Sequence, residues 1–297
     1  MKVRIKSALI MAPLLVLVFL GGYFLIAGVI VLSVLALKEF STAFGEKRPA
    51  AWVFWVSLGV LYACYLGLII WNSQIAHIPA VIWFVRMPFL HLIPVWVAIS
   101  VVLCLLSMFT TEKRDLIHGM AAFVGVFYII FFAFHLVLVN GYFSSPYDIS
   151  VINIPGFRSY VWILLLSAFG TDIFAYLIGK AIGRHKLCPA ISPKKTVEGS
   201  IGGVFGSVLL CGLFSLVFMP AEFWTCIVIG VAGGIFSQFG DLAASAMKRK
   251  IGIKDWGTLI PGHGGVLDRI DSILFTAPLV YYILVIKEYL IMYGFLK

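Results

Sequence analysis

The chain has 297 residues, of which 62% are hydrophobic and only 12% are charged, with a formal net charge of +9 at pH 7. This is more apolar surface than one soluble core can bury, which excludes an ordinary soluble enzyme and predicts an all-α, polytopic integral membrane protein. The sequence contains no basic soluble module, so the positive charge favours attraction to anionic lipid and not nucleic-acid binding.

In chain order, the apolar stretches long enough to cross a bilayer predict about nine transmembrane helices. They lie near residues 3–20, 23–37, 51–71, 88–110, 116–140, 158–179, 201–219, 222–244 and 271–292. Gly21 and Gly22 interrupt the first apolar stretch, which we interpret as a tight hairpin of two short spans; one long tilted helix is the alternative. A basic start resembles a signal peptide, but no convincing cleavage site follows, so we expect a retained first span.

The distribution of basic residues predicts the orientation of these spans. With the N-terminus inside and the C-terminus outside (N-in/C-out), most of the 22 basic residues lie in the cytoplasm, and the exceptions are Arg86, Arg158, Lys287 and Lys297. The positive-inside rule favours this arrangement over one with eight spans.

A loop at residues 141–157 separates two halves that we expect to form one membrane domain. In residues 1–157, with about five spans, the charges stand at span ends, as in Lys38-Glu39, and indicate interfacial anchors on a scaffold. In residues 158–297, with about four spans, charges occur within or just after the spans, which is costly unless they face one another, a metal or water. We therefore expect the functional site in the second half.

Several carboxylates of the second half should converge at the cytoplasmic face, where their spans begin or end. Asp241 and Ser245 would share one helix face, and Asp268 and Asp271 would share the first turn of the last span. Oxygen ligands beside Lys and Arg, without cysteine, suit Mg²⁺ bound to substrate phosphates. We predict a metal site from Asp172, Asp241, Asp268 and Asp271 and leave a second cation open; for an isolated Asp, complementing the helix dipole is the alternative.

Other motifs limit the chemistry. The basic loop at residues 180–199 offers cations for a polyphosphate, and Gly262, Gly264 and Gly265 allow backbone N–H groups to approach an anion. The sequence has no P-loop and no dinucleotide-binding glycine motif. Its five cysteines are scattered and show no zinc spacing, so they indicate apolar packing.

Residues 245–271 resemble the signature of phosphatidate cytidylyltransferases (CDP-diglyceride synthases). The pattern is Ser-x-apolar-Lys-Arg, four residues, then Lys-Asp-x-small-x-x-apolar-Pro-x-His-Gly-Gly-apolar-x-Asp-Arg-apolar-Asp, and every fixed position is filled. Ser192-Pro-Lys-Lys-Thr196 with Glu198 and Gly199 also resembles a family motif, as does Asp172 with Ala175-Tyr176. Val197 departs from the family, since many members carry Trp there. The resemblance is close over residues 160–275.

This resemblance implies a reaction in which CTP and phosphatidic acid give CDP-diacylglycerol and pyrophosphate, with Mg²⁺. It implies an active site on the cytoplasmic face of a bacterial inner membrane, and a homodimer. For the site, we predict catalytic phosphate-binding residues at Lys248, Arg249, Lys254, His263 and Arg269; for His263, an ordinary loop residue is the alternative. We predict substrate-binding residues at Lys194, Lys195, Thr196, Glu198, Ser245, Gly264 and Gly265.

Two alternatives remain open from the sequence. A secondary transporter or channel for a phosphorylated anion would also need buried charges, although it would place them at mid-span and not at the cytoplasmic boundary. A related CTP-dependent transferase could act on another lipid phosphate.

Overall fold

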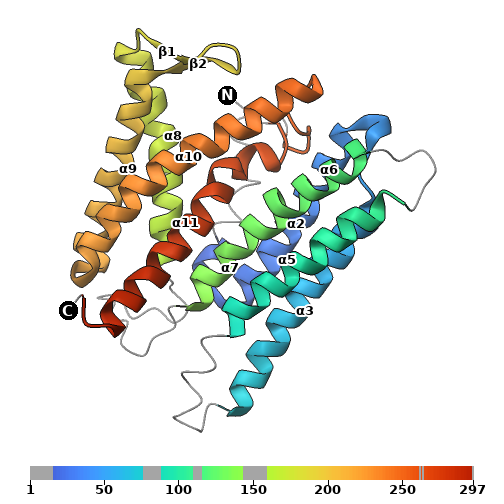
Figure 1. The fold of residues 1–297 in the computed structure, drawn as a ribbon. Helices are drawn as coiled ribbons and strands as arrows, with labels where there is room; N and C mark the ends of the chain where they lie inside the picture. The colour runs from blue at the N-terminus through green and yellow to red at the C-terminus, as the bar shows by residue number, and fades with distance from the viewer. Residues whose placement is uncertain are drawn as a thin grey trace. The chain divides into compact units, whose positions relative to one another are not determined.

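The computed structural model describes residues 16–75, 88–109, 116–142, 159–260, 262 and 264–295. In these ranges, seven helices are long and apolar enough to cross a membrane, and Leu92–Ser107 forms a shorter apolar helix (Figure 1). The protein is therefore an all-α polytopic membrane protein, as expected. The number of nine spans and the N-in/C-out orientation stay predictions, and most of the first predicted span lies outside the described residues.

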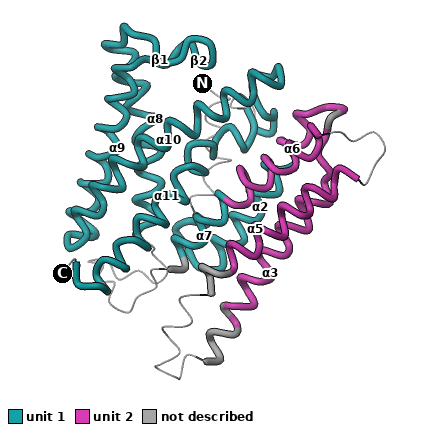
Figure 2. The backbone as a smooth tube through the Cα atoms, in the orientation of Figure 1, with its two compact units in different colours: residues 1–39, 132–297 teal, residues 40–131 magenta. Residues whose placement is uncertain are grey.

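The chain forms two compact units (Figure 2). Unit 1 comprises residues 1–39 and 132–297, and unit 2 comprises residues 40–131. Unit 1 thus takes helices from both sides of residue 157, where the sequence suggested a division between a scaffold and the functional half. That assignment of roles stays a prediction.

Unit 2 contains α3 (Ala51–Ile75), α5 (Pro88–Ser107), α6 (Leu116–Gly125), a 3-10 turn η1 (Gly45–Lys47) and a π-helical turn η2 (Val126–Phe131). Trp96 is buried, and its Nε1 donates a hydrogen bond to the Ser57 carbonyl at 2.9 Å. The hydroxyls of Ser57 and Ser100 are also hydrogen-bonded, at 2.8 Å. Such contacts matter because lipid supplies no hydrophobic force between apolar helices.

Unit 1 contains most of α2 (Gly22–Ala43) and all of α7 (Phe132–Tyr142), α8 (Ser159–Ile182), α9 (Val197–Phe218), η3 (Pro220–Glu222), α10 (Phe223–Ile251) and α11 (Leu267–Met292). Glycines let these helices approach closely. A Cβ at Gly199 of α9 would lie 2.7 Å from the Ala175 carbonyl oxygen of α8, and one at Gly240 of α10 would lie 2.7 Å from the Asp271 carbonyl oxygen of α11. These contacts bring the polar residues of four helices together.

Two helix boundaries differ from those expected. Helix α10 continues to Ile251, seven residues beyond the predicted end of its span, and stops where Gly252 adopts a left-handed conformation with φ of 83°. Asp241 therefore lies within the helix and not at its end. Helix α11 begins at Leu267, which places Asp268 in the first turn but Asp271 in the second. The prediction that both share the first turn was wrong.

The basic loop between α8 and α9 contains secondary structure that the sequence analysis did not predict. Strands β1 (Lys186–Cys188) and β2 (Ser192–Thr196) form an antiparallel hairpin, with Lys186 opposite Thr196 and Cys188 opposite Ser192. The Val197 N–H donates to the His185 carbonyl at 2.9 Å, which ties the hairpin to the start of α9. Strands this short leave little periodic signal in a sequence.

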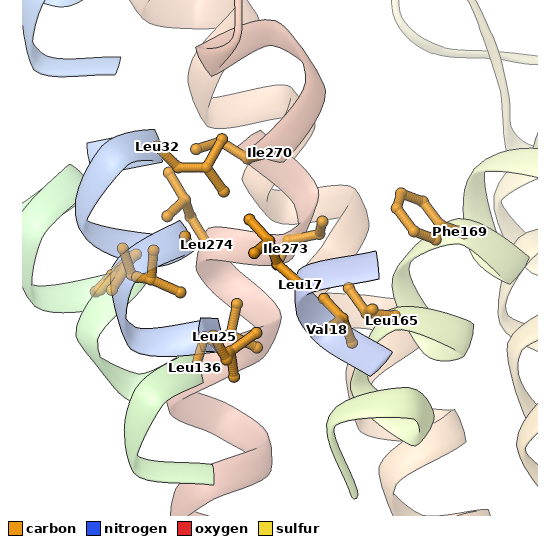
Figure 3. Close-up of a pocket in the computed structure, with 15 residues that line it drawn as sticks. Leu17, Val18, Leu25, Leu32, Leu136, Leu165, Phe169, Ile270, Ile273 and Leu274 are labelled. Atoms are coloured by element: carbon orange, nitrogen blue, oxygen red, sulfur yellow. The ribbon is translucent and has the colours of Figure 1, made fainter. Parts of the chain in front are cut away.

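Unit 1 also encloses a small cavity of about 50 Å³ (Figure 3). Its lining is apolar and comes from residues 17–18 and helices α2, α7, α8 and α11, including Leu25, Leu136, Phe169 and Ile273. A water in this cavity would find no polar side chains to bind. The charged site of the protein is elsewhere.

Candidate active site

A polar pocket of about 340 Å³ lies between α8, the β1–β2 hairpin, α9 and α10. Side chains of both charges line it, together with glycine backbone and neutral polar groups. The lining residues used below are Asp172, Tyr176, Lys180, Lys194, Lys195, Thr196, Gly199, Ser200, Gln238 and Asp241. A concave site with a few convergent polar groups is typical of a ligand-binding pocket.

Lys195 and Asp241 meet across this pocket. The Lys195 Nζ lies 2.6 Å from Asp241 Oδ2, and the two side chains are 26% and 31% exposed. The Ser245 hydroxyl, one helical turn beyond Asp241, donates to Asp241 Oδ1 at 3.3 Å. Three predicted site residues are thus brought together. Because the ion pair is partly solvated, either member can exchange its partner for a ligand at low cost.

The hairpin is held in place by two residues predicted to bind substrate. The Glu198 carboxylate accepts hydrogen bonds from the backbone N–H groups of Arg184 (3.0 Å) and His185 (3.3 Å), and it contacts His185 Nδ1 at 2.6 Å. The Thr196 hydroxyl accepts from the Gly199 N–H at 3.1 Å and caps α9. Both contacts lie at the base of the hairpin: Glu198 holds the residues before β1, and Thr196 joins the end of β2 to α9.

Gln238 and Ser200 form part of the pocket wall without having been assigned a role from the sequence. The Gln238 Nε2 donates to the carbonyls of Ser200 (3.0 Å) and Gly234 (3.1 Å), and the Ser200 hydroxyl donates to Gln238 Oε1. These bonds join α9 to α10. A polar side chain inside an apolar span is the sequence signal that could have identified Gln238 and Ser200.

Three of the four predicted metal ligands lie on helices that contact one another, α8, α10 and α11. The negative charges of Asp172, Asp241 and Asp271 act on one another. Ser272 connects two of them, because its hydroxyl donates to Asp172 Oδ2 at 3.3 Å and its N–H donates to Asp271 Oδ1 at 2.8 Å. Helices α8, α10 and α11 therefore each contribute one carboxylate to this group.

Asp268 has a different environment. The Lys248 Nζ lies 2.6 Å from Asp268 Oδ1, and these side chains are only 10% and 4% exposed. The second oxygen, Oδ2, accepts from the N–H groups of Trp256 (2.8 Å) and Gly265 (3.0 Å). Gly264 has φ of 83°, and a Cβ there would lie 2.9 Å from Asp268 Oδ2. The glycine loop thus encloses a carboxylate of the protein itself.

The remaining predicted phosphate-binding residues lie around this junction of α10 and α11. The Arg249 Nη1 donates to the Ile253 carbonyl at 2.9 Å, and the Lys254 and Arg269 side chains are exposed. The charge of Arg269 acts on Asp172, which links the junction electrostatically to the pocket. His263 lies outside the described residues.

Glu39 was missed by the sequence analysis, which interpreted it as an interfacial anchor. Its carboxylate accepts hydrogen bonds from the backbone N–H groups of Val266 and Leu267, both at 2.9 Å. These N–H groups stand at the start of α11, beside Asp268. The side chain is therefore part of the structure around the site.

The donor set is compatible with Mg²⁺ bound partly through substrate. In the described part of the chain, no three carboxylate, imidazole or thiol groups form a ready-made metal cluster. Mg²⁺ usually takes one or two carboxylates and completes its shell with waters and phosphates. Asp172, Asp241 and Asp271 offer carboxylate oxygens from three helices, and their role as Mg²⁺ ligands stays a prediction. Asp268 already has both oxygens hydrogen-bonded, and its role as a ligand stays a prediction.

Comparison with known proteins identifies the family. The model of the "Cytidylyltransferase family" matches residues 2–287. The chain belongs to the cytidylyltransferase family. Three curated relatives are each named "Phosphatidate cytidylyltransferase". The one from Synechocystis sp. is 53% identical over 120 residues, which are 40% of this chain and 40% of the relative.

The other two cytidylyltransferases give matches of similar extent. The Bacillus subtilis protein is 41% identical over 140 residues, or 46% of this chain and 52% of its own length. The Staphylococcus aureus protein is 46% identical over 128 residues, which are 42% of this chain and 49% of the relative's own length. The chain thus spans about half the length of the curated relatives it matches, or less.

Proposed function

We propose that this protein transfers CMP from CTP to phosphatidic acid, giving CDP-diacylglycerol and pyrophosphate, at the cytoplasmic face of a bacterial inner membrane. The observation that carries the proposal is the pocket in which Lys194 and Lys195 face Asp172 and Asp241, in a chain of the cytidylyltransferase family. The names of the relatives support phosphatidic acid as the lipid substrate.

The proposed reaction is a displacement at phosphorus. A phosphate oxygen of phosphatidic acid attacks the α-phosphorus of CTP, the bond from the α-phosphorus to the bridging oxygen breaks, and pyrophosphate leaves with that oxygen. The nucleophile is already anionic, so the site must chiefly orient the two substrates and offset their negative charge. In this proposal Lys194 and Lys195 bind the triphosphate. Lys254 and Arg269, at the junction of α10 and α11, are exposed cations that can bind further phosphate oxygens.

In this proposal Mg²⁺ would be held by Asp172, Asp241 and Asp271, with Asp268 as a further predicted ligand, and would neutralise phosphate charge when bound. The side chains themselves order the site. Ser245 orients Asp241, and Ser272 orients Asp172 and Asp271. The proposal assigns one Mg²⁺ and leaves open whether a second cation binds.

The surface beside the pocket suits a lipid substrate. Ile173 and Leu177 flank the pocket residues of α8 and are 52% and 54% exposed, and Ile201 on α9 is 68% exposed. A charged pocket bordered by exposed apolar side chains can accept the phosphate headgroup of a lipid while the lipid's acyl chains stay in the bilayer.

A homodimer is also part of the proposal, and cross-linking in membranes tests it.

The test is a product assay with purified protein in detergent–lipid micelles. Wild type should convert labelled CTP into an organic-extractable CDP-lipid and release equimolar pyrophosphate, only when CTP, phosphatidic acid and Mg²⁺ are all present. Asp241→Asn should lose at least about 100-fold in kcat, the order seen when one group that stabilises transition-state charge is removed. Glu46→Gln, at an exposed residue of η1, is the control and should match wild type.

Other outcomes separate the alternatives. Turnover with a different lipid phosphate but not with phosphatidic acid would keep the transferase and change its substrate. Uptake of a phosphorylated anion by proteoliposomes without any CDP-lipid would contradict the transferase and favour a transporter. Full activity of Asp241→Asn would move the reacting centre away from this pocket.

A further inference from the structure

Glu39, on α2, contacts the start of α11. Its two partners there, Val266 and Leu267, lie 227 and 228 residues further along the chain. One carboxylate oxygen, Oε1, accepts from the Val266 N–H and the other, Oε2, accepts from the Leu267 N–H. Both N–H groups belong to the first turn of a helix, where no intrahelical carbonyl is available to them. Val266 stands at the N-cap position and makes no side-chain cap bond. Glu39 therefore supplies a cap from another helix.

The loop before α11 is shaped around this carboxylate. A Cβ at Gly257 would lie 2.7 Å from Glu39 Oε1, and a Cβ at Gly265 would overlap Glu39 Oε2. Neither glycine has a positive φ, so the backbone conformation alone does not require glycine there. Glycine is required there because a Cβ would occupy the space of the Glu39 side chain. Gly257 and Gly265, which belong to the 245–271 signature, thus leave room for Glu39, which lies outside it.

The position of this helix start matters for the site. Asp268 follows Leu267 directly, Arg269 is next, and Asp271 lies one turn further along α11. Asp271 also meets α10 where the Gly240 backbone approaches it. A shift of the first turn would displace all three side chains relative to Asp172 and Asp241. Displacements of about 1 Å at a reacting centre can cost about 100-fold in rate.

We propose that Glu39 is a positioning residue for nucleotide transfer: it fixes the first turn of α11, and with it Asp268, Arg269 and Asp271, in the geometry the reaction needs. This inference rests on the proposed function and adds to it a residue from the N-terminal part of the chain. Glu39 acts through the backbone of α11 and does not contact substrate.

The kinetic test uses Glu39→Gln, which keeps the size of the side chain but replaces one acceptor oxygen by an NH₂ group facing an N–H donor. We expect kcat per folded molecule to fall roughly ten- to a hundredfold and KM for CTP to change less than kcat, because Lys194 and Lys195, which bind the triphosphate in the proposed function, are on the hairpin. The matched control is Glu222→Gln, whose carboxylate pairs with Lys287 near the other end of α11. It should lower thermal stability and leave kcat unchanged.

A second test needs no activity. Gly265→Ala should strongly lower the unfolding temperature in wild type but much less in a Glu39→Ala background, because all three nearest atoms to the new Cβ belong to Glu39. Gly264→Ala should gain no such relief, since its Cβ would meet Asp268 and Asp255. This cycle measures the contact between Glu39 and the loop.

The outcomes distinguish the two proposals. If wild type makes no CDP-lipid, the proposed function fails, and the stability cycle alone decides whether Glu39 fixes the start of α11. If wild type is active and Glu39→Gln keeps its kcat per folded molecule, the positioning role is overturned while the function stands. Equal damage from Gly265→Ala in both backgrounds would also overturn it.

Discussion

The two charged clusters of unit 1 use the same residue types in opposite environments. At the pocket, Lys195 and Asp241 form an ion pair that is about one quarter to one third exposed. At the start of α11, Lys248 and Asp268 form a pair of the same length that is 10% and 4% exposed. An exposed pair contributes little to stability and can open for a ligand, whereas breaking a buried pair strands a charge. The first cluster is suited to binding and the second to maintaining the helix junction.

The largest expected effect comes from breaking the buried pair. Asp268→Asn should destabilise the protein by about 3–5 kcal/mol, because it removes the carboxylate that directly pairs with the buried Lys248 cation. The measurement is thermal or denaturant unfolding in detergent. Asp268→Asn combined with Lys248→Met should be more stable than Asp268→Asn alone, because the stranded charge is gone.

This prediction also changes how the metal site should be tested. The sequence analysis predicts Asp268 as a metal ligand, but both of its carboxylate oxygens are hydrogen-bonded within the protein, so loss of activity in an Asp268 variant would not by itself identify a metal ligand. Asp241→Asn is the cleaner variant. If Asp268→Asn leaves the unfolding free energy unchanged, the contrast between the two clusters is wrong.

A smaller effect is expected at the exposed pair. Lys195→Met should change stability by less than about 1 kcal/mol and raise KM for CTP by about tenfold, the value of one charge-assisted hydrogen bond to phosphate. Steady-state kinetics with varied CTP measures this. Lys250→Met, an exposed cation in the last turn of α10, is the control and should leave KM unchanged. A loss of several kcal/mol in Lys195→Met would show that this pair too is structural.

Sequence reasoning named residues of both the pocket and the junction but missed Glu39, for a physical reason. Asp172 and Asp241 are charges within apolar helices, and such charges stand out in the sequence of a membrane protein. Glu39 stands near the end of its helix, where a carboxylate is ordinary, and its partners are backbone N–H groups 227 and 228 residues away. Every residue except proline carries a backbone N–H. No particular residue type therefore marks these donors, and the sequence carries no sign of this contact.

The fold shows the same difference. Apolar length predicted the membrane helices, because about 20 apolar residues are needed to cross a bilayer. It did not predict the β1–β2 hairpin, whose strands have three and five residues, nor the continuation of α10 through Lys248 and Arg249. Polar ends of helices that project beyond the apolar stretch lie outside what hydropathy can detect.

The smallest expected effect is at Thr196, which is buried, lines the pocket and caps α9. Thr196→Ala should cost about 1 kcal/mol, because the Gly199 N–H loses its acceptor. Thr196→Ser keeps the oxygen and should stay close to wild type in stability. Hydrogen exchange at the Gly199 amide measures the cap directly, and it should quicken only in the Ala variant.

Thr196 also tests where the boundary between binding and structural groups lies. It stands next to Lys195, yet its hydroxyl is used inside the protein, so we expect Thr196→Ala to alter KM for CTP less than Lys195→Met does. If instead Thr196→Ala raises KM as much as Lys195→Met while the Gly199 amide stays protected, the hydroxyl belongs to the binding group. Burial would then be a poor guide to role at this pocket, because a capped helix start and a ligand contact would share one side chain.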